Sequence, residues 1–281
     1  MIAAFSKRVI KKSLNSLGLE VRRLGISSAD GKYPRSSTQG LLQQARCLGL
    51  SPATVIDVGA AYGSFSLECC NVFARAQYVL VEALEEFEPF IKAAIKSIAN
   101  AEYILSAAAA VSGEITINVH ADLVGSSIYR EQEGLTVDGV PRTVPVMALD
   151  RLIPDYQIRA PFLIKIDVQG AELDVLRGAE KILEDTEYII LEVSFFEIFK
   201  QGTQFYDVVT FMKSKGFVVY DVCGLQYRPL DNALCQADIA FVRDEGLFRS
   251  YHYYANPEQR RQQNKKFELQ KKQLSRKYKV K

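Results

Sequence analysis

The chain has 281 residues, which suits one large domain with modest additions, and its 48% hydrophobic and 24% charged residues are an ordinary balance for a globular protein. The net charge of +2 is uneven, because residues 258–281 hold ten Lys or Arg and two Glu, and residues 1–23 hold six Lys or Arg and one Glu. The body between these basic ends is therefore acidic, which argues against a DNA or RNA substrate.

The five cysteines have no C-x-x-C spacing, so the sequence predicts neither a disulfide framework nor a structural zinc site. No apolar run is long enough to cross a membrane. Basic residues near the start are interleaved with apolar ones rather than followed by an apolar block, so a secretory leader is not expected. These features predict a cytoplasmic protein with reduced thiols.

Residues 1–50 are expected to form a helical extension. Residues 2–17 place apolar side chains at helical spacing with Lys and Arg between them. Such a helix packs on the body or on a partner subunit, or it lies on an anionic membrane surface; its short apolar stripe favours packing. A polar linker over residues 27–38 and a second helix over residues 38–48 follow.

From residue 51 to 245, short apolar runs alternate with helical patterns. Strands are expected at residues 54–58, 78–81, 103–107, 162–166 and 188–193, with helices at 85–98 and 171–183 between them. This alternation predicts an α/β domain with a mostly parallel, doubly wound sheet and helices on both faces. Two final strands, at 216–222 and 238–242, predict an antiparallel hairpin that completes a seven-stranded sheet.

Two segments lie outside this alternation. Residues 115–147 mix strand-like pieces with loop residues, and they are expected to form an insertion over the active site. Residues 246–281 form a basic tail, either a solvated helix or disordered.

The loop after the first strand reads VIDVGAAYGS over residues 55–64. A strand that runs into a tight turn of small residues lets the backbone approach a ligand at the carboxyl edge of the sheet. The spelling D-x-G-x-A-x-G differs from the G-x-G-x-x-G of a pyrophosphate site. An acid at the start of the loop suits the cationic end of S-adenosylmethionine (SAM), which has no phosphate. The predicted SAM-binding residues in this loop are Asp57, Gly59, Ala60, Ala61, Gly63 and Ser64.

Glu82 ends the second strand, where a carboxylate can accept hydrogen bonds from both ribose hydroxyls. Ala83 after it and Ala107 at the end of the third strand complete the predicted SAM site. An acid at this position serves NAD equally well, so a nicotinamide-dependent oxidoreductase stays open, and only the spelling of the loop favours SAM. The alternative is that Asp57 caps the turn and Glu82 is a solvated acid.

The most specific block reads LIKIDVQGAE over residues 163–172, followed by VLRGA over residues 175–179. It resembles the K-I-D-V-E/Q-G-x-E-x-x-V-L-x-G-A signature of the FkbM family of SAM-dependent methyltransferases. The resemblance runs from about residue 54 to 243 and includes Ser126 and Ser127. It implies a Rossmann-like class I methyltransferase. The chain departs from the family at Ala61, where Asn is usual, and at Ala83, where Pro is common.

The carboxyl end of the fourth strand carries the predicted acceptor chemistry. Asp167 is expected to face SAM and acceptor, and Lys165 lies on the same side of the strand, where burial requires a carboxylate partner. Glu172 and Glu192 add carboxylates around the cleft. The predicted catalytic residues are Asp167, Lys165 and Glu192. Alternatively, Asp167 and Glu172 only cap the following helix.

One of these carboxylates is expected to act as a base, whereas a divalent metal bound by several of them is an alternative, and no metal ligand is assigned. Only two histidines occur. His120 lies in the insertion near the site, where it is a weaker candidate base, and His252 precedes the basic tail.

The resulting prediction is an O-methyltransferase that acts on a hydroxyl of a sugar, glycan or natural product. Residues 115–147 and 194–204 are expected to select the acceptor. The alternative is a non-catalytic or degenerate SAM-binding module associated with glycan assembly at a membrane surface. The predicted partners are the acceptor and, through the basic ends, the inner face of a membrane; nucleic acid is not expected, and an oligomer stays open.

Overall fold

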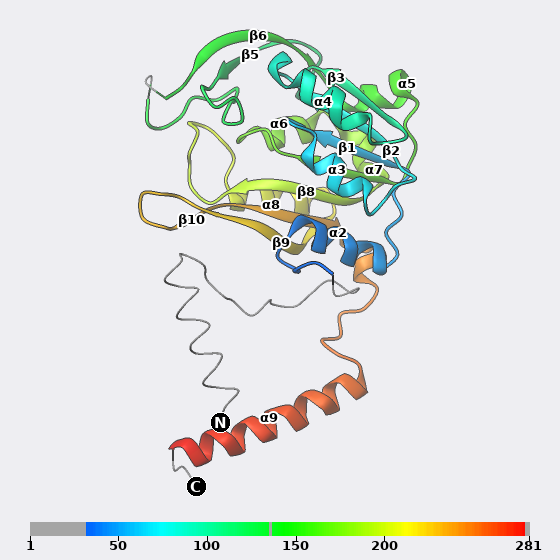
Figure 1. Ribbon diagram of the computed structural model, residues 1–281, viewed down its shortest axis with the longest axis vertical. Helices are drawn as coiled ribbons and strands as arrows, with labels where there is room; N and C mark the ends of the chain where they lie inside the picture. Colours follow the sequence, from blue (N-terminus) through cyan, green and yellow to red (C-terminus); the bar gives the residue numbers. More distant parts are fainter. Residues whose placement is uncertain (1–31, 135–136, 279–281) are drawn as a thin grey trace. The chain divides into compact units, whose positions relative to one another are not determined.

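The computed structural model describes residues 32–134 and 137–278 (Figure 1). The chain divides into two compact units, with the boundary between Leu247 and Phe248, and each unit is described by itself. The helix predicted at residues 2–17 lies outside the described residues.

The first unit is built on a seven-stranded sheet with the order β3-β2-β1-β7-β8-β10-β9. Neighbouring strands are parallel, except that β10 runs antiparallel to both β8 and β9. This arrangement confirms the predicted Rossmann-like sheet with its C-terminal hairpin. The strands are β1 (Thr54–Val58), β2 (Gln77–Glu82), β3 (Ala101–Leu105), β7 (Phe162–Ile166), β8 (Thr186–Ser194), β9 (Phe217–Tyr227) and β10 (Leu234–Arg243).

Helices cover both faces of this sheet, and β1 and β7 are therefore buried at every residue. Alternate residues of a strand point to opposite faces. Ile56 and Val58 pack with Val208 of α8 in the main apolar core, whereas Asp57 between them bonds Ser66 of α3 on the other face. The helices of the first unit are α2 (Thr38–Cys47), α3 (Ser64–Cys70), η1 (Glu85–Phe87), α4 (Glu88–Ile95), η2 (Leu149–Arg151), α5 (Leu152–Tyr156), α6 (Glu172–Arg177), α7 (Glu180–Glu184) and α8 (Phe205–Ser214). The short helix η3 (Leu247–Arg249) spans the boundary between the two units.

Two predicted elements differ in their bounds. The helix expected over residues 171–183 is two helices, α6 and α7, which meet at Gly178; a side chain there would lie 2.1 Å from the carbonyl oxygen of Ala109. The third strand ends at Leu105 rather than at Ala107, because Ser106 turns the chain and donates its N–H to the carbonyl of Glu82 at 2.8 Å.

The insertion predicted over residues 115–147 belongs to a second sheet that begins earlier, at Ala107, and has the order β4-β6-β5. Figure 1 shows this sheet beside the β3 end of the first sheet. Its strands are β4 (Ala107–Ala108), β5 (Gly113–Val119) and β6 (Val140–Met147). The loop after β5 turns back on that strand, since Asn118 and Ser127 form an isolated antiparallel bridge. Ser127 Oγ also donates to the carbonyl of Gln169 at 2.7 Å, so this loop is fixed to the end of β7.

The second unit contains the helix α9 (Pro257–Tyr278), which carries most of the basic tail and has no buried residue. Of the two alternatives for the tail, the structure confirms the solvated helix. Among the helices of the described residues, none is long and apolar enough to cross a membrane.

Candidate active site

A pocket of about 490 Å³ lies at the carboxyl ends of β1, β2, β7 and β8. Parallel strands of an open α/β sheet present their ligand sites at this edge. One wall comes from the loops that follow these strands. Another part of the wall is the insertion loop, residues 122–128. The volume is typical of sites for small molecules and cofactors.

The turn after β1 brings backbone to the pocket wall at Gly59 and Ala61. Gly59 has a φ of 75°, and a side chain there would lie 1.8 Å from the carbonyl oxygen of Asp167. Glycine is therefore required both for the conformation and for the close approach of β1 to β7. Ala60, Gly63 and Ser64 were predicted to bind SAM, but they do not line the pocket; Ser64 begins α3.

Asp57 is buried beneath this turn rather than in the pocket wall. One of its oxygens accepts a hydrogen bond from Ser66 Oγ at 2.6 Å. Burial raises the pKa of Asp57 to about 6, against the lowering effects of Ser66 and Lys165. Its carboxylate is thus placed to hold the first strand to α3, and any effect on a ligand acts through the turn above it.

Glu82 lies in the pocket wall and organises the turn. Its two carboxylate oxygens accept hydrogen bonds from the backbone N–H of Ala61 at 2.8 Å and of Leu84 at 2.9 Å. Burial raises the pKa of Glu82, although these backbone donors oppose the shift. Each carboxylate oxygen has a further lone pair, so Glu82 can still accept from a ligand's hydroxyls. Ala83 and Ala107 line the same part of the pocket.

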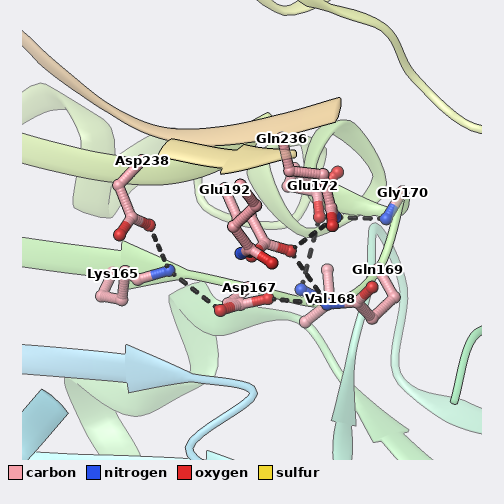
Figure 2. A network of polar contacts seen from close by, with 10 residues as sticks. Lys165, Asp167, Val168, Gln169, Gly170, Glu172, Glu192, Gln236 and Asp238 are labelled. Atoms are coloured by element: carbon pink, nitrogen blue, oxygen red, sulfur yellow. Dashed lines mark hydrogen bonds and ion pairs between the residues drawn. The ribbon is translucent and has the colours of Figure 1, made fainter. Parts of the chain in front are cut away.

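Lys165 is 7% exposed and lies between two carboxylates, as Figure 2 shows. Its Nζ is 3.1 Å from Asp167 Oδ2 and 3.1 Å from Asp238 Oδ1. Burial alone would lower the pKa of Lys165, but Asp167, Asp238 and Glu192 outweigh it and raise the pKa above its ordinary value. Lys165 is therefore a charged residue that holds Asp167 in place, and it does not line the pocket.

Glu192 shares the pocket wall with Asp167 and is surrounded by amide groups. Its carboxylate accepts from Gln169 Nε2 at 2.9 Å, from Gln226 Nε2 at 2.7 Å and from Gln236 Nε2 at 2.8 Å. Gln169 also donates to Asp167 at 3.0 Å and so links the two acids. Burial and the neighbouring Asp167 raise the pKa of Glu192 to about 8, while Lys165 lowers it.

Glu172 lies apart from this pair, at the start of α6. Its Oε1 accepts from the backbone N–H of Gly170 at 3.1 Å and of Val168 at 3.3 Å, and its Oε2 accepts from Thr203 Oγ1 at 3.2 Å. Burial raises the pKa of Glu172 to about 7. Glu172 therefore caps the turn that precedes α6, which is the alternative that the sequence left open for it.

His120 contacts acids of the insertion rather than the acceptor side of the pocket. Its Nδ1 lies 2.9 Å from Asp122 and its Nε2 lies 3.7 Å from Glu131. No group of three or more His, Cys, Asp or Glu side chains within residues 32–134 and 137–278 has the geometry of a metal site.

The structure adds site residues that sequence reasoning missed. Asp238 supplies the second partner of Lys165, and Gln226 and Gln236 contact Glu192. Asp238 lies opposite Glu192 in the ladder between β10 and β8, and Gln236 lies opposite Gln226. The available signal was a polar side chain at alternate positions of an otherwise apolar final strand.

The chain is similar to known methyltransferases. The sequence model of the methyltransferase FkbM domain matches residues 57–219, more than half of the chain. Over 51 residues, the chain is 31% identical to the hexuronic acid methyltransferase AglP of Haloferax volcanii, and this stretch covers 18% of the chain and 21% of that relative. The chain therefore matches about a fifth of the relative's length.

Two solved structures are similar at low identity. The precorrin-6y C5,15-methyltransferase of Geobacter metallireducens GS-15 matches with a TM-score of 0.40 and 13% identity, over 79% of this chain and 92% of that chain. The magnesium protoporphyrin IX methyltransferase (ChlM) of Synechocystis PCC 6803, with bound SAH, matches with a TM-score of 0.41 and 11% identity, over 84% and 99%. The match to the family's sequence model includes the turn after β1 and the block at the end of β7. The chain therefore belongs to the FkbM family of SAM-dependent methyltransferases.

Proposed function

We propose that the protein methylates a hydroxyl group of a sugar, glycan or natural product and that Asp167 and Glu192 receive the hydroxyl proton. One observation carries the proposal: the two acids lie in the wall of the same pocket as the small-residue turn after β1. Positioning is the main task of such an enzyme, since the methyl group of SAM is already activated by its positive sulfur.

The residues present fit SAM. Gly59 and Ala61 present backbone without bulk, and Glu82 offers carboxylate lone pairs suited to ribose hydroxyls. Ala83 and Ala107 leave room beside Glu82. In this proposal Asp57, Ala60, Gly63 and Ser64 support the turn from below, and Asp57 acts through its bond to Ser66.

A base is needed at the acceptor because a sugar hydroxyl holds its proton at neutral pH. The acceptor oxygen forms a bond to the methyl carbon, the bond from that carbon to sulfur breaks, and the hydroxyl proton passes to a carboxylate. Glu192 suits this task, since burial and Asp167 raise its pKa to about 8. Lys165 keeps Asp167 in place from behind through an ion pair.

The name of the curated relative, a hexuronic acid methyltransferase, supports a sugar as the acceptor class. The test is incubation of the full chain with labelled SAM and a panel of glycosides, polyols and phenolic natural products, followed by mass spectrometry. The proposal predicts labelled ether products with sugars. Labelling confined to amines, thiols or nucleic acid would contradict it.

A second role is favoured by α9. The helix has no buried residue, and it carries paired basic residues along its length as well as exposed Phe267, Leu274 and Tyr278. Clusters of Lys and Arg beside apolar side chains bind anionic lipid surfaces. We propose that the tail, residues 246–281, brings the catalytic domain, residues 51–245, to the inner face of a membrane.

A further inference from the structure

The charged side chains in the pocket wall are all acidic. Among the described residues that line it are the acids Glu82, Asp122, Asp167 and Glu192, and none of these lining residues is Lys, Arg or His. Lys165 lies behind the wall, with its charge engaged by Asp167 and Asp238. An acceptor with its own carboxylate would therefore approach acidic side chains, including Glu192, which must be ionised to act as the base. It would find no cation among the described lining residues.

Amide groups take the place of cations at the acceptor end. Gln169 follows β7, Gln226 is on β9 and Gln236 is on β10, and all three donate to Glu192. Three separate elements thus converge on one carboxylate. A set of neutral donors around the candidate base selects partners by hydrogen bonding and not by charge.

The three amides also keep acceptor capacity. Each glutamine amide has two N–H donors and one carbonyl oxygen. In the hydrogen bonds of these three side chains, Nε2 is the donor. No described residue donates a hydrogen bond to their side-chain carbonyl oxygens. These oxygens suit the hydroxyl groups of a ring, which are donors and acceptors at once.

We infer that the acceptor is an uncharged polyhydroxylated ring, recognised by Gln169, Gln226 and Gln236, and that the acids of the pocket wall exclude uronic acids. The inference rests on the proposed function and narrows it. Asp122, on the insertion loop, lines the same pocket as Glu192 and contributes to the exclusion.

The test compares matched pairs of acceptors, each a methyl hexoside and the uronic acid of the same sugar, with labelled SAM and the full chain. We expect kcat/KM for the neutral member to exceed that for the uronic acid by at least tenfold. Equal or faster methylation of the uronic acid overturns the inference but leaves the proposed function standing. Methylation of neither member of any pair overturns the inference, and labelling confined to amines, thiols or nucleic acid overturns the proposed function as well.

A variant of Gln226 separates recognition from folding, because Gln226 is exposed on β9. Gln226→Leu removes one donor to Glu192, so we expect a several-fold higher KM for the neutral acceptor and a pH–rate profile displaced to higher pH. Gln270→Leu, an exposed position of α9, is the matched control. An unchanged KM and profile in Gln226→Leu overturns the role of the amides.

A variant of Asp122 tests the exclusion itself. Asp122→Asn removes a charge but keeps an oxygen for the backbone N–H of Gly125, which Asp122 binds at 2.9 Å. We expect the preference for the neutral member of each pair to shrink several-fold. An unaltered preference overturns the assignment of the exclusion to this acid.

Discussion

Ala61 is held in the left-handed region, with a φ of 45°. This conformation costs an L-residue with a β-carbon about 1–2 kcal/mol, and Asn and Gly adopt it more readily than Ala. The Asn usual in the family at this position therefore has a backbone reason as well as a polar side chain. The strain persists here because the N–H of Ala61 is fixed by Glu82 at 2.8 Å.

Substitution of Ala61 by Gly should therefore raise the free energy of unfolding. Ala61→Gly relieves the left-handed strain but frees the unfolded chain, so the expected gain in the free energy of unfolding is at most about 1 kcal/mol. Ala60→Gly, one residue earlier and outside the left-handed region, should instead lose about 0.5–1 kcal/mol. Denaturant unfolding measures both. A loss of stability in Ala61→Gly equal to that in Ala60→Gly would show that the strain is absent.

Glu192 predicts how the methyl-transfer rate depends on pH. A base must be ionised, and the pKa of Glu192 is raised to about 8, so the rate should rise as pH increases through about 8. Glu192→Gln should lower kcat by about 10²–10⁴ and remove this rise. A pH–rate profile of wild type and variant checks both. A rise that persists in Glu192→Gln would identify a different base.

The raised pKa of Glu192 also affects stability, which falls with rising pH whereas the rate increases. The folded state holds the proton of Glu192 more tightly than the unfolded chain does, since the pKa rises from 4.5 to about 8. Its contribution is fully present below about pH 4.5 and is lost as pH rises toward 8. The contribution of Glu192 to the free energy of unfolding therefore falls over the same pH range in which Glu192 becomes active as a base.

At the scale of elements, the close approach of β1 to β7 builds the pocket floor. Gly59 makes it possible, because only a residue without a side chain fits beside the carbonyl of Asp167. The two strands are in register along their whole length, from Thr54 opposite Phe162 to Val58 opposite Ile166. The turn after β1 and the acid after β7 are thus brought together by sheet pairing.

Gly59→Ala tests this approach against strain alone. Gly216 has a similar φ of 80°, but a side chain there would meet nothing within 4 Å. Gly216→Ala should cost about 1–2 kcal/mol from the left-handed conformation. Gly59→Ala should cost at least about 1–3 kcal/mol more, from overpacking, and lose SAM binding. Thermal unfolding and calorimetry decide the matter; equal losses in the two variants would contradict the role of close packing.

Sequence predicted the elements that carry strong local patterns. The strands β1 and β7 have the predicted bounds, since both are short apolar runs buried on both faces. The break of the helix at Gly178 was not predictable, because it depends on the backbone at Ala109, far away in the sequence. Tertiary contact there overrides the helical pattern.

The features of the site were likewise predictable only where they follow from local sequence. Asp167 and Glu82 follow predicted strands and Glu192 lies near the end of one, so their gathering at one edge was predictable. The exclusion of Asp57 and Lys165 from the pocket wall was not, because it depends on which face of the sheet each side chain meets. The contacts of Gln226 and Gln236 depend on the register of the last hairpin, which sequence alone does not give.

For the whole molecule, charge is separated between the two units. Eight Lys and Arg residues lie in α9, a solvated helix of the second unit, whereas the pocket wall of the first unit is acidic. The proposed acceptor site and the proposed membrane contact therefore use different parts of the chain.

Lysine substitution in α9 tests the membrane contact. Lys265, Lys266, Lys271 and Lys272 lie on the exposed helix, and each contributes about 1 kcal/mol near an anionic surface. Replacement of all four by Gln should abolish sedimentation with vesicles that contain phosphatidylserine, and high salt should weaken binding of the wild type. Equal sedimentation of wild type and variant would contradict the contact. Activity on a free sugar serves as the control for folding.

Titration calorimetry with S-adenosylhomocysteine tests most directly whether the pocket binds SAM. Wild type should bind, and Glu82→Gln should bind at least about tenfold more weakly, since a hydrogen bond to a charged group contributes about 1.5–3 kcal/mol. Glu85→Ala, an exposed neighbour on η1, should bind as wild type does. Unchanged affinity in Glu82→Gln, or binding of NAD in place of S-adenosylhomocysteine, would contradict the assignment.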